Sequence, residues 1–179
     1  IGYHELHSED QTSNSEFLKF YKGLYKPLQN HLIFIPNSVY GTDTISSLKN
    51  DLSLEQIKKN KSFTKYKYTS KLNIVNYPQT AFLESLIKTP TLLLYKKDKW
   101  VFDKKFHNFY KKLVKYNIIF HDPVKAAKHV NFISNDINSW WNSKKIQLIL
   151  KDFLDHTCVV SNFSQDIWNT SLKKKLKIN

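Results

Sequence analysis

The sequence predicts an α/β fold in which helices flank a parallel sheet and an all-helical segment follows the last strand. Two observations carry this prediction. Short apolar runs alternate with amphipathic helical patterns along most of the chain, which is typical of βαβ units. In the clearest unit, residues 71–95, an apolar strand, a polar turn, a helix and a second apolar strand follow one another. The crossover of such a unit is right-handed and its strands are parallel.

Composition limits the class of protein. The 179 residues, of which 41% are hydrophobic, suit one globular domain with a core of its own. The single cysteine, Cys158, excludes an internal disulfide and favours a reducing compartment. No apolar run approaches the roughly 18 residues of a membrane helix, and the N-terminus lacks the order of a signal peptide. We therefore expect a cytoplasmic protein with at most peripheral association at the inner face of the membrane.

The predicted domain begins after a polar stretch. Residues 1–15 have no periodicity and are expected to form a flexible tail. Residues 16–179 are expected to form one domain, with a helical extension over 136–179. The sequence contains no methionine, so we expect the chain to be a processed or truncated piece of a longer protein.

The first predicted helix covers residues 16–28, where apolar residues recur every three or four positions. Ser15 is suitably placed to cap it. Residues 32–35 form a continuous apolar run ended by Pro36, which is typical of a buried parallel strand. Weaker patterns predict two short helices and an edge strand, at residues 44–48, 52–60 and 61–70.

From residue 72 onward the patterns are stronger. Amphipathic spacing predicts a helix over 101–116, which Asn117 ends, and Asp122 with Pro123 caps and begins another helix that carries Ala126, Ala127, Val130 and Ile133 inward. The double tryptophan, Trp140 and Trp141, is expected to pack the core. The remaining predicted strands are 72–76, 91–95 and 118–121, and the remaining predicted helices are 79–87, 136–141, 143–156 and 164–176.

A ligand site is expected where the first strand of the central unit ends. Parallel sheets bind ligands at the carboxyl ends of their strands, and the turn at 76–80 leads from a strand into a helix. Backbone N–H groups at this helix start attract an anion, phosphate first. The Thr80 hydroxyl could join them, and Glu84, one turn later, could bind ribose hydroxyls. The alternative makes Thr80 a local cap and Glu84 a solvated residue.

Histidine and lysine give weaker signals. His121 ends a predicted strand, where it could contact a phosphate, act as a base, or cap the turn at Asp122 and Pro123. The seven histidines show paired ligand spacing only at His4 and His7, so we expect no metal, and no cofactor is indicated. The formal charge of +13 comes from lysine alone, which leaves nucleic-acid binding as a weak alternative, because bidentate arginine is missing.

Four segments, in order, resemble motifs of bacterial surface-carbohydrate transferases of the lipopolysaccharide and capsule type. They are Tyr40-Gly41, residues 76–92, residues 117–127 and residues 138–143. The resemblance extends over about residues 15–175 and implies a GT-B glycosyltransferase fold. This chain resembles its C-terminal, Rossmann-like half, which holds the nucleotide-sugar donor. The implied binding residues are Tyr40, Gly41, Asn76, Tyr77, Pro78, Gln79, Thr80, Glu84 and His121; no catalytic residue is assigned.

The resemblance also implies a partner and leaves an alternative function open. An N-terminal GT-B half, or a separate chain that supplies it, is the implied partner. The family pattern has charged residues where this sequence has Phe34, Val39 and Asn76, and a tryptophan where it has Thr42. These substitutions favour, as the alternative to a transferase in surface polysaccharide biosynthesis, a degenerate, non-catalytic binding module of the same fold.

Overall fold

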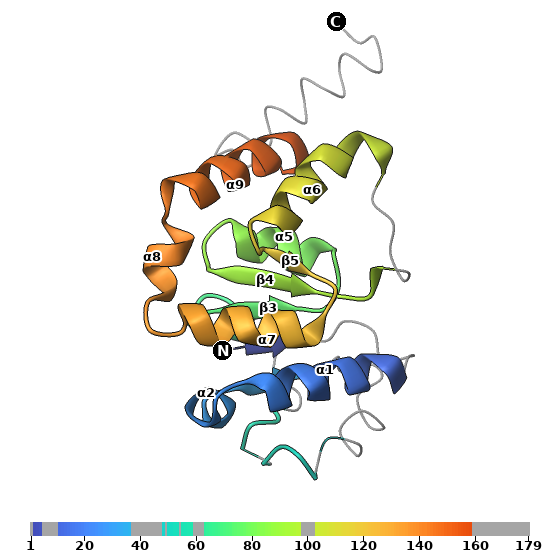
Figure 1. Cartoon of the computed structure of the whole chain (residues 1–179), viewed down its shortest axis with the longest axis vertical. Helices are drawn as coiled ribbons and strands as arrows, with labels where there is room; N and C mark the ends of the chain where they lie inside the picture. Colours follow the sequence, from blue (N-terminus) through green and yellow to red (C-terminus); the bar gives the residue numbers. More distant parts are fainter. Residues whose placement is uncertain are drawn as a thin grey trace, which may run out of the picture.

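The computed structural model describes residues 2–4, 11–36, 48, 50–53, 55–58, 63–97 and 103–158. Within these ranges the chain forms a five-stranded sheet in the order β2-β1-β3-β4-β5, and all four pairings are parallel (Figure 1). The prediction of an α/β fold with a parallel sheet is therefore confirmed. The strands are β1 (Gly2–His4), β2 (Ile33–Ile35), β3 (Asn73–Val75), β4 (Thr91–Leu94) and β5 (Ile119–Phe120).

Helices cover both faces of the sheet, and each face has its own apolar cluster. One cluster joins the sheet to α1 (Gln11–Gly23) and α7 (Pro123–Ile133). The other joins it to α4 (Phe63–Tyr66), α5 (Thr80–Leu86), α6 (His107–Lys115) and α9 (Lys144–Thr157). Short helices α2 (Lys26–Asn30), η2 (Lys104–Phe106) and α8 (Ile137–Trp141) connect these layers.

Most residues of β2, β3, β4 and β5 are apolar because both faces of the sheet are covered. In β3, Ile74 belongs to the cluster under α1 and α7, whereas its neighbour Val75 belongs to the opposite cluster. In β4, Leu92 and Leu93 divide in the same way. Each fully buried side chain of this kind contributes about 1.5–3 kcal/mol, so the sheet is stabilised mainly by what packs on it.

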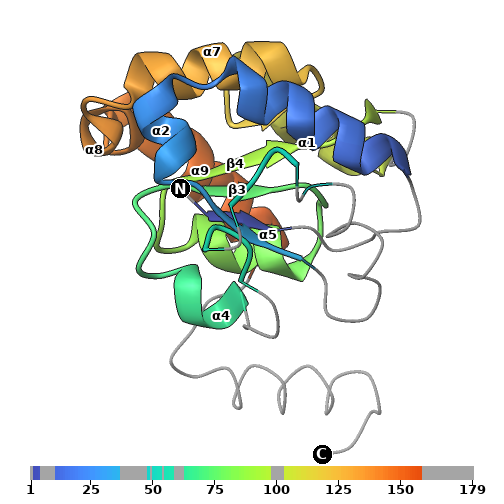
Figure 2. The ribbon, with the colours of Figure 1, turned by 90° about the horizontal axis from the view of Figure 1, so that it is seen from below.

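Helices α1 and α7 lie side by side (Figures 1 and 2). A Cβ atom at Gly23 would come within 2.8 Å of the Cβ of Ala127, which is too close for any larger residue. Asn131 of α7 also forms hydrogen bonds with the backbone at the C-terminal end of α1. Its Oδ1 accepts from the N–H of Tyr25 at 2.9 Å, and its Nδ2 donates to the carbonyl of Gly23 at 2.9 Å.

The prediction of a flexible tail over residues 1–15 is wrong for the residues of this stretch that the structure describes. Residues 2–4 form β1, between β2 and β3, and α1 begins at Gln11 instead of residue 16. A three-residue strand is too short to show periodicity, so pairing on both edges, a tertiary effect, decides its conformation.

The first predicted helix also ends earlier than expected, at Gly23. Pro27 lacks an N–H group and cannot continue a helix from its preceding turn, so a separate helix, α2, begins at Lys26. Two carbonyls at and just after the end of α1 are bound by Gln29, whose Nε2 donates to the carbonyl of Tyr21 at 3.1 Å and to that of Leu24 at 3.0 Å. This side chain joins the two helices.

Between β2 and β3 the weak predictions are corrected or lie outside the described residues. In place of a helix over 52–60, Ile57 forms a parallel bridge with Phe34, which extends the edge of the sheet at β2. In place of an edge strand over 61–70, the chain forms α4, because Phe63 packs into the core cluster with α5. Most of the short helix predicted at 44–48, and the whole helix predicted at 164–176, are outside the described ranges.

The elements from residue 72 to residue 157 agree with the prediction to within a few residues. Asn117 ends α6 with a positive φ of 60°, and the Asp122 side chain caps α7 by accepting from two backbone N–H groups. The helical region predicted at 101–116 begins, within the described residues, at Asp103, which caps η2. Trp141 is buried and Trp140 packs beside it, as expected. Within the described part of the chain, no helix has the length and apolar character needed to cross a membrane.

Asn131 should be required for stability, because it pairs two backbone groups that would otherwise be partly buried and unsatisfied. We expect Asn131→Leu to lower the free energy of unfolding by about 2–4 kcal/mol, since each unpaired buried group costs about 1–3 kcal/mol. Urea unfolding at equilibrium measures this. Asn135→Leu, at an exposed position just after α7, is the matched control; an equal loss in both variants would contradict the assigned role.

His129 should make stability depend on pH. Its ring packs against Phe120 and Trp140, and burial lowers its pKa from 6.5 to about 4. Between these values the unfolded chain binds more protons than the folded one, so acid favours unfolding. The stabilising effect of a neutral His129 is complete above pH 6.5 and declines as the pH falls toward 4, by about 2–3 kcal/mol in total. Urea unfolding at several pH values measures the slope.

The slope should be shallower in His129→Leu, which cannot be protonated. His31→Asn, which alters an exposed histidine, should keep the slope of the wild type. If the His129→Leu variant lost stability in acid as steeply as the wild type, other groups would account for the effect.

Candidate functional site

The turn after β3 lies where the order of strands in the sheet reverses. From β1 the chain moves outward to β2 and then returns to β3 on the other side of β1. In open parallel sheets, ligands bind outside the carboxyl ends of the strands at such a reversal. The predicted binding turn, residues 76–80, leaves β3 at this place. The structure therefore puts the turn at the position where this fold class has its crevice.

The turn itself is partly accessible. Asn76, Tyr77 and Pro78 are half-buried, whereas Gln79 and Thr80 are exposed. The backbone N–H of Gln79 donates to the carbonyl of Tyr77 at 2.9 Å, and Gln79 is the N-cap of α5. Thr80, the first residue of α5, is thus not its cap, which leaves the exposed hydroxyl at the carboxyl edge of the sheet.

Glu84 is held by a lysine that the sequence did not single out. The Lys67 ammonium donates to Oε2 of Glu84 and lies 4.8 Å from the ring centroid of Tyr68. The Lys67 side chain is 5% exposed and that of Glu84 is 48% exposed. Burial lowers the pKa of Lys67, but its interactions with Glu84 and Tyr68 outweigh burial and raise that pKa overall. Glu84 therefore serves as the counter-charge of a buried cation.

His121 follows β5 and contacts two tyrosines. Its Nδ1 lies 3.0 Å from the backbone carbonyl of Tyr95, which follows β4, and its Nε2 is hydrogen-bonded to the hydroxyl of Tyr110, in the first turn of α6. The rings of His121 and Tyr95 pack edge to face, with 4.8 Å between their centroids. The expectation that His121 caps the next turn is wrong, because Asp122 makes those hydrogen bonds itself.

Tyr95 and Tyr110 are site residues that sequence reasoning did not identify. Tyr95 could have been found, because parallel neighbouring strands bring the residues that follow them to the same edge, and Tyr95 and His121 both follow strands. Tyr110 occupies the apolar face of a predicted helix, where an aromatic residue is usually a packing residue. Only the rotation of α6 on the sheet brings its hydroxyl to His121.

The predicted residues thus occupy two places along one edge of the sheet. Residues 76–80 and Glu84 are at the end of β3, and His121 is at the end of β5, with β4 between them. Tyr40 and Gly41 lie outside the described residues. No group of three or more histidine, cysteine or carboxylate side chains suited to a metal ion occurs in the described part of the chain.

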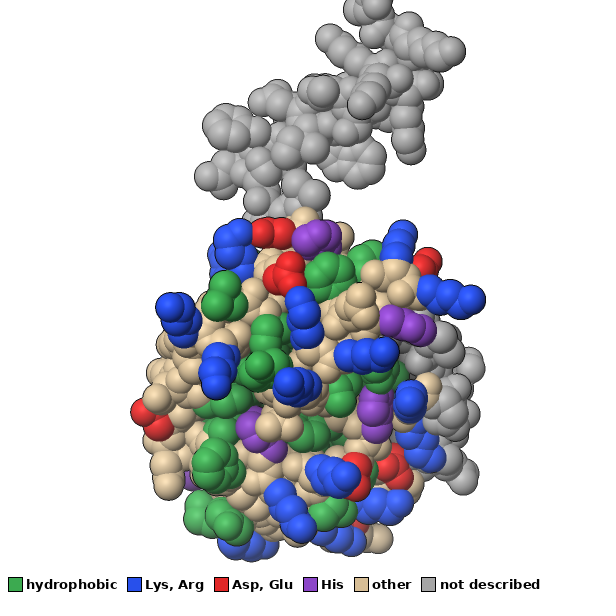
Figure 3. Space-filling model, turned by 45° about the horizontal axis from the view of Figure 1, so that its top comes forward, with side chains coloured by type: hydrophobic (Ala, Val, Ile, Leu, Met, Phe, Trp, Pro, Cys, Tyr) green, Lys and Arg blue, Asp and Glu red, His purple; other side chains and the backbone are tan. Residues whose placement is uncertain are grey.

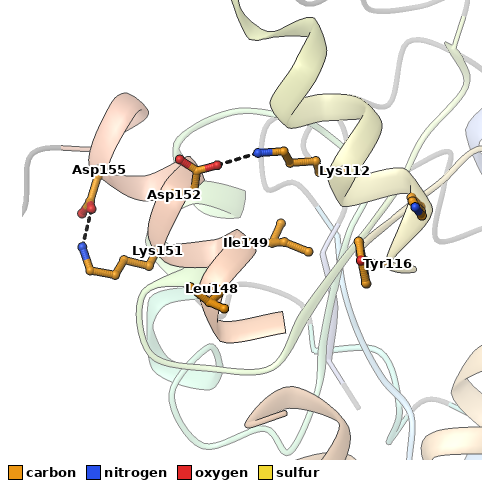
Figure 4. A pocket seen from close by; sticks show the side chains of 8 residues that line it. Lys112, Tyr116, Leu148, Ile149, Lys151, Asp152 and Asp155 are labelled. Carbon is orange, nitrogen blue, oxygen red and sulfur yellow. Dashed lines mark hydrogen bonds and ion pairs between the residues drawn. The ribbon is translucent and has the colours of Figure 1, made fainter. Parts of the chain in front are cut away.

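A separate groove of about 630 Å³ lies between α6 and α9. Two ion pairs border it, Lys112 with Asp152 at 2.8 Å and Lys151 with Asp155 at 2.5 Å (Figure 4). Its lining includes Tyr116, which precedes β5 and therefore lies toward the amino ends of the strands. This groove is away from His121 and from the predicted binding turn.

Lysine side chains are spread across the face seen in Figure 3, with hydrophobic and acidic side chains between them. On that face they do not gather into one stripe. A nucleic-acid footprint is typically a continuous basic patch or stripe, so the visible face gives little support to that alternative.

A parallel α/β sheet with polar side chains collected at the carboxyl ends of its strands is the architecture of a ligand-binding or enzyme domain. Sequence comparison gives the family: residues 5–172 match the LIC12162 family transferase. The match covers more than half of the chain, so the chain belongs to this transferase family. No curated protein and no solved structure matches the chain.

The pair formed by Lys67 and Glu84 should respond unequally to the loss of either partner. Glu84→Gln leaves a buried ammonium without its counter-charge, so we expect it to lower the free energy of unfolding by about 1–2 kcal/mol, a buried-pair cost reduced because Glu84 is half-exposed. Lys67→Met should cost less than about 1 kcal/mol, since Glu84 can return to water. Urea unfolding of both variants, with Lys65→Met as an exposed control, measures the difference.

The same pair has a pH signature. Because the pKa of Lys67 is raised above 10.5 in the folded chain, its stabilising effect is present below pH 10.5 and is lost as the pH rises through the folded value. The difference between wild type and Glu84→Gln should therefore shrink in alkali. A difference that stayed constant there would exclude the ion pair as its cause.

Proposed function

We propose that this chain is the donor-binding part of a glycosyltransferase-like enzyme of surface polysaccharide biosynthesis, and that it binds a nucleotide-sugar diphosphate. In this proposal the chain supplies the Rossmann-like nucleotide-binding half of a GT-B arrangement. Membership of a transferase family supports a transfer reaction. The observation that carries the proposal is the position of residues 76–80, which leave β3 next to β1 where the strand order reverses.

The charge of the same edge suits a diphosphate. The described segments 95–97, 103–106 and 121–125 hold five lysines, whereas their two carboxylates, Asp103 and Asp122, accept hydrogen bonds from backbone N–H groups at helix starts. An edge with more cations than anions attracts phosphate oxygens. Donors aimed at a departing diphosphate would stabilise the charge that develops on it. The lysines are Lys96, Lys97, Lys104, Lys105 and Lys125.

A second candidate is a degenerate module that keeps the fold without catalysis. Two observations favour it: Asn76 stands where the resembling transferases have an aspartate, and Glu84, expected at the ribose, is bound to Lys67. On this alternative the carboxyl edge of the sheet contacts another protein half instead of a nucleotide. Binding experiments with nucleotides separate the two candidates.

Thr80 gives the sharpest test of the proposed donor site. We expect the chain to bind at least one of a panel of nucleoside diphosphates in calorimetry, and Thr80→Val to weaken that binding about tenfold through the loss of one hydrogen bond to a charged group. Valine keeps the β-branched shape, and Thr80 is exposed, so the melting temperature should not change.

Thr69→Val is the matched control, because Thr69 is also exposed but lies just after α4, outside the turn at 76–80, where its hydroxyl donates to the carbonyl of Tyr66. It should bind like the wild type. Absence of saturable binding by the wild type to every nucleoside diphosphate would overturn the donor site and leave the non-catalytic module. Normal binding by Thr80→Val, with a lowered melting temperature, would make Thr80 a structural residue.

A further inference from the structure

The stretches that lead into the strands lie at the edge of the sheet opposite to residues 76–80. Because every described pairing is parallel, they all approach from the same end of the domain. Helix α7 starts after β5 and runs back along the sheet, so its last turn, α8 and the start of α9 lie at this end too; Figures 1 and 2 show α2 and α8 there, at the left. This amino-edge surface consists of residues 24–32, 67–72, 87–90, 115–118 and 130–145.

Large hydrophobic side chains are exposed at four points of the amino-edge surface. Phe132, near the end of α7, is 84% exposed, and Tyr25, between α1 and α2, is 64% exposed. Tyr68 and Ile87, which precede β3 and β4, are exposed as well. Single exposed hydrophobic residues are normal on a protein surface and need no explanation. Here four separate stretches each contribute one to the same end of the domain, which indicates a surface that contacts a partly apolar partner.

The same surface is basic. Six of its lysines are exposed and form no ion pair with another described residue, and the seventh, Lys67, is the buried partner of Glu84. The five stretches contain one carboxylate, Asp136, which caps α8. Cations and aromatic rings are interleaved: the Lys88 ammonium lies 5.7 Å from the ring centroid of Tyr68. The six exposed lysines are Lys26, Lys71, Lys88, Lys115, Lys144 and Lys145. This end of the domain therefore has an excess of positive charge.

We propose that the amino-edge surface binds an anionic phospholipid membrane. The lysine ammonium groups contact the phosphates of the lipid headgroups, and the rings of Phe132 and Tyr25 insert between the headgroups. Binding of this kind combines buried apolar area with attraction to anionic lipids. The flexible stem of a lysine lets its charge reach the headgroups while its apolar neighbours insert. This assigns a membrane contact to residues that neither the family match nor the proposed donor site involves.

The composition of the surface favours a membrane over other partners. Protein–protein interfaces are depleted of lysine at their centres, whereas lysine supplies all of the positive charge here. Readout of nucleic-acid sequence relies on bidentate arginine, which this chain lacks. The contributing residues also come from helix ends and loops spread along one whole edge of the sheet. Such an arrangement suits a broad partner, and a bilayer is one.

Membrane binding at this end leaves the proposed donor site free. Residues 76–80 follow β3 at the opposite edge of the sheet. A domain that contacts the membrane through its amino-edge surface therefore presents the carboxyl ends of its strands to water, from which a nucleotide arrives. The inference does not depend on that site, because lipid vesicles without nucleotide test it.

Flotation of the full chain with lipid vesicles measures the binding. Vesicles of phosphatidylcholine and phosphatidylglycerol in equal amounts should bind the protein, and vesicles of phosphatidylcholine alone should bind it at least about tenfold more weakly. Raising the salt concentration to about 1 M, where the screening length falls to about 3 Å, should remove most of this preference.

Phe132→Ser tests the apolar part of the contact. It should weaken binding to the anionic vesicles about tenfold, because one aromatic ring no longer leaves water. Val124→Ser is the matched control, since Val124 is 46% exposed on the same helix but lies at its start, toward the carboxyl edge. This control should bind the vesicles like the wild type.

Lys144→Gln combined with Lys145→Gln tests the charged part, at the start of α9. Each lysine near an anionic membrane strengthens binding about fivefold, so loss of both should weaken it about twentyfold. Lys104→Gln combined with Lys105→Gln removes the same charge at the opposite edge and should bind nearly like the wild type. Circular dichroism of every variant verifies that the fold is kept.

Several outcomes would overturn the inference. Equal binding to both kinds of vesicle, or to neither, would do so, as would an equal loss from the two lysine pairs, which would make total charge the cause. If Phe132→Ser bound the anionic vesicles like the wild type, and a single-stranded oligonucleotide bound the chain more tightly than they do, the surface would be a nucleic-acid site. A dimer in size-exclusion chromatography that Phe132→Ser dissociates, without vesicle binding, would make it an interface between two copies.

Discussion

Short parallel strands impose the main constraint on this protein. Each strand has two to four residues, so the sheet has few backbone hydrogen bonds with which to hold its own order. Parallel sheets of this kind are stable only when helices cover both faces. Here α1 and α7 cover one face, and α4, α5, α6 and α9 cover the other. The close contact between α1 and α7, which Asn131 joins, therefore helps to keep the strands paired.

The same constraint determines where chemistry can occur. Because every described pairing is parallel, the residues that follow the strands meet at one edge. Asn76 follows β3, Tyr95 follows β4 and His121 follows β5, and between them they span three neighbouring strands. The helix starts after β3 and β5 and the first turn of α6 lie at this edge as well. A ligand that extends along it would touch residues that are far apart in the sequence.

Two polar clusters at or near this edge differ in what they do for the protein. In the pair of Lys67 and Glu84 the cation is buried, so its role is to satisfy a charge that the fold encloses. In the cluster of Tyr95, Tyr110 and His121, two members are partly exposed, and the hydrogen bonds join the ends of β4 and β5 to the first turn of α6. The first cluster stabilises the loop and helix around α5, whereas the second joins the ends of β4 and β5 to α6.

The sequence by itself determined the elements between residues 72 and 157, because long amphipathic helices and β-branched strands carry their own periodicity. It also indicated the proposed binding turn at 76–80, since the strand, turn and helix are contiguous in the chain. Only the tertiary structure decided β1, where three residues become a strand by pairing on both edges, and α4, where Phe63 is drawn into the core.

The counter-charge for Lys67 and the partners of His121 were likewise decided in three dimensions. Lys67 and Glu84 are 17 residues apart, and Tyr95 and His121 are 26 residues apart. No local pattern encodes such pairs, because the rotation of a helix on the sheet and the register of parallel strands follow from packing over the whole core. Periodicity specifies which face of an element is apolar, and packing alone selects the polar groups that meet at its ends.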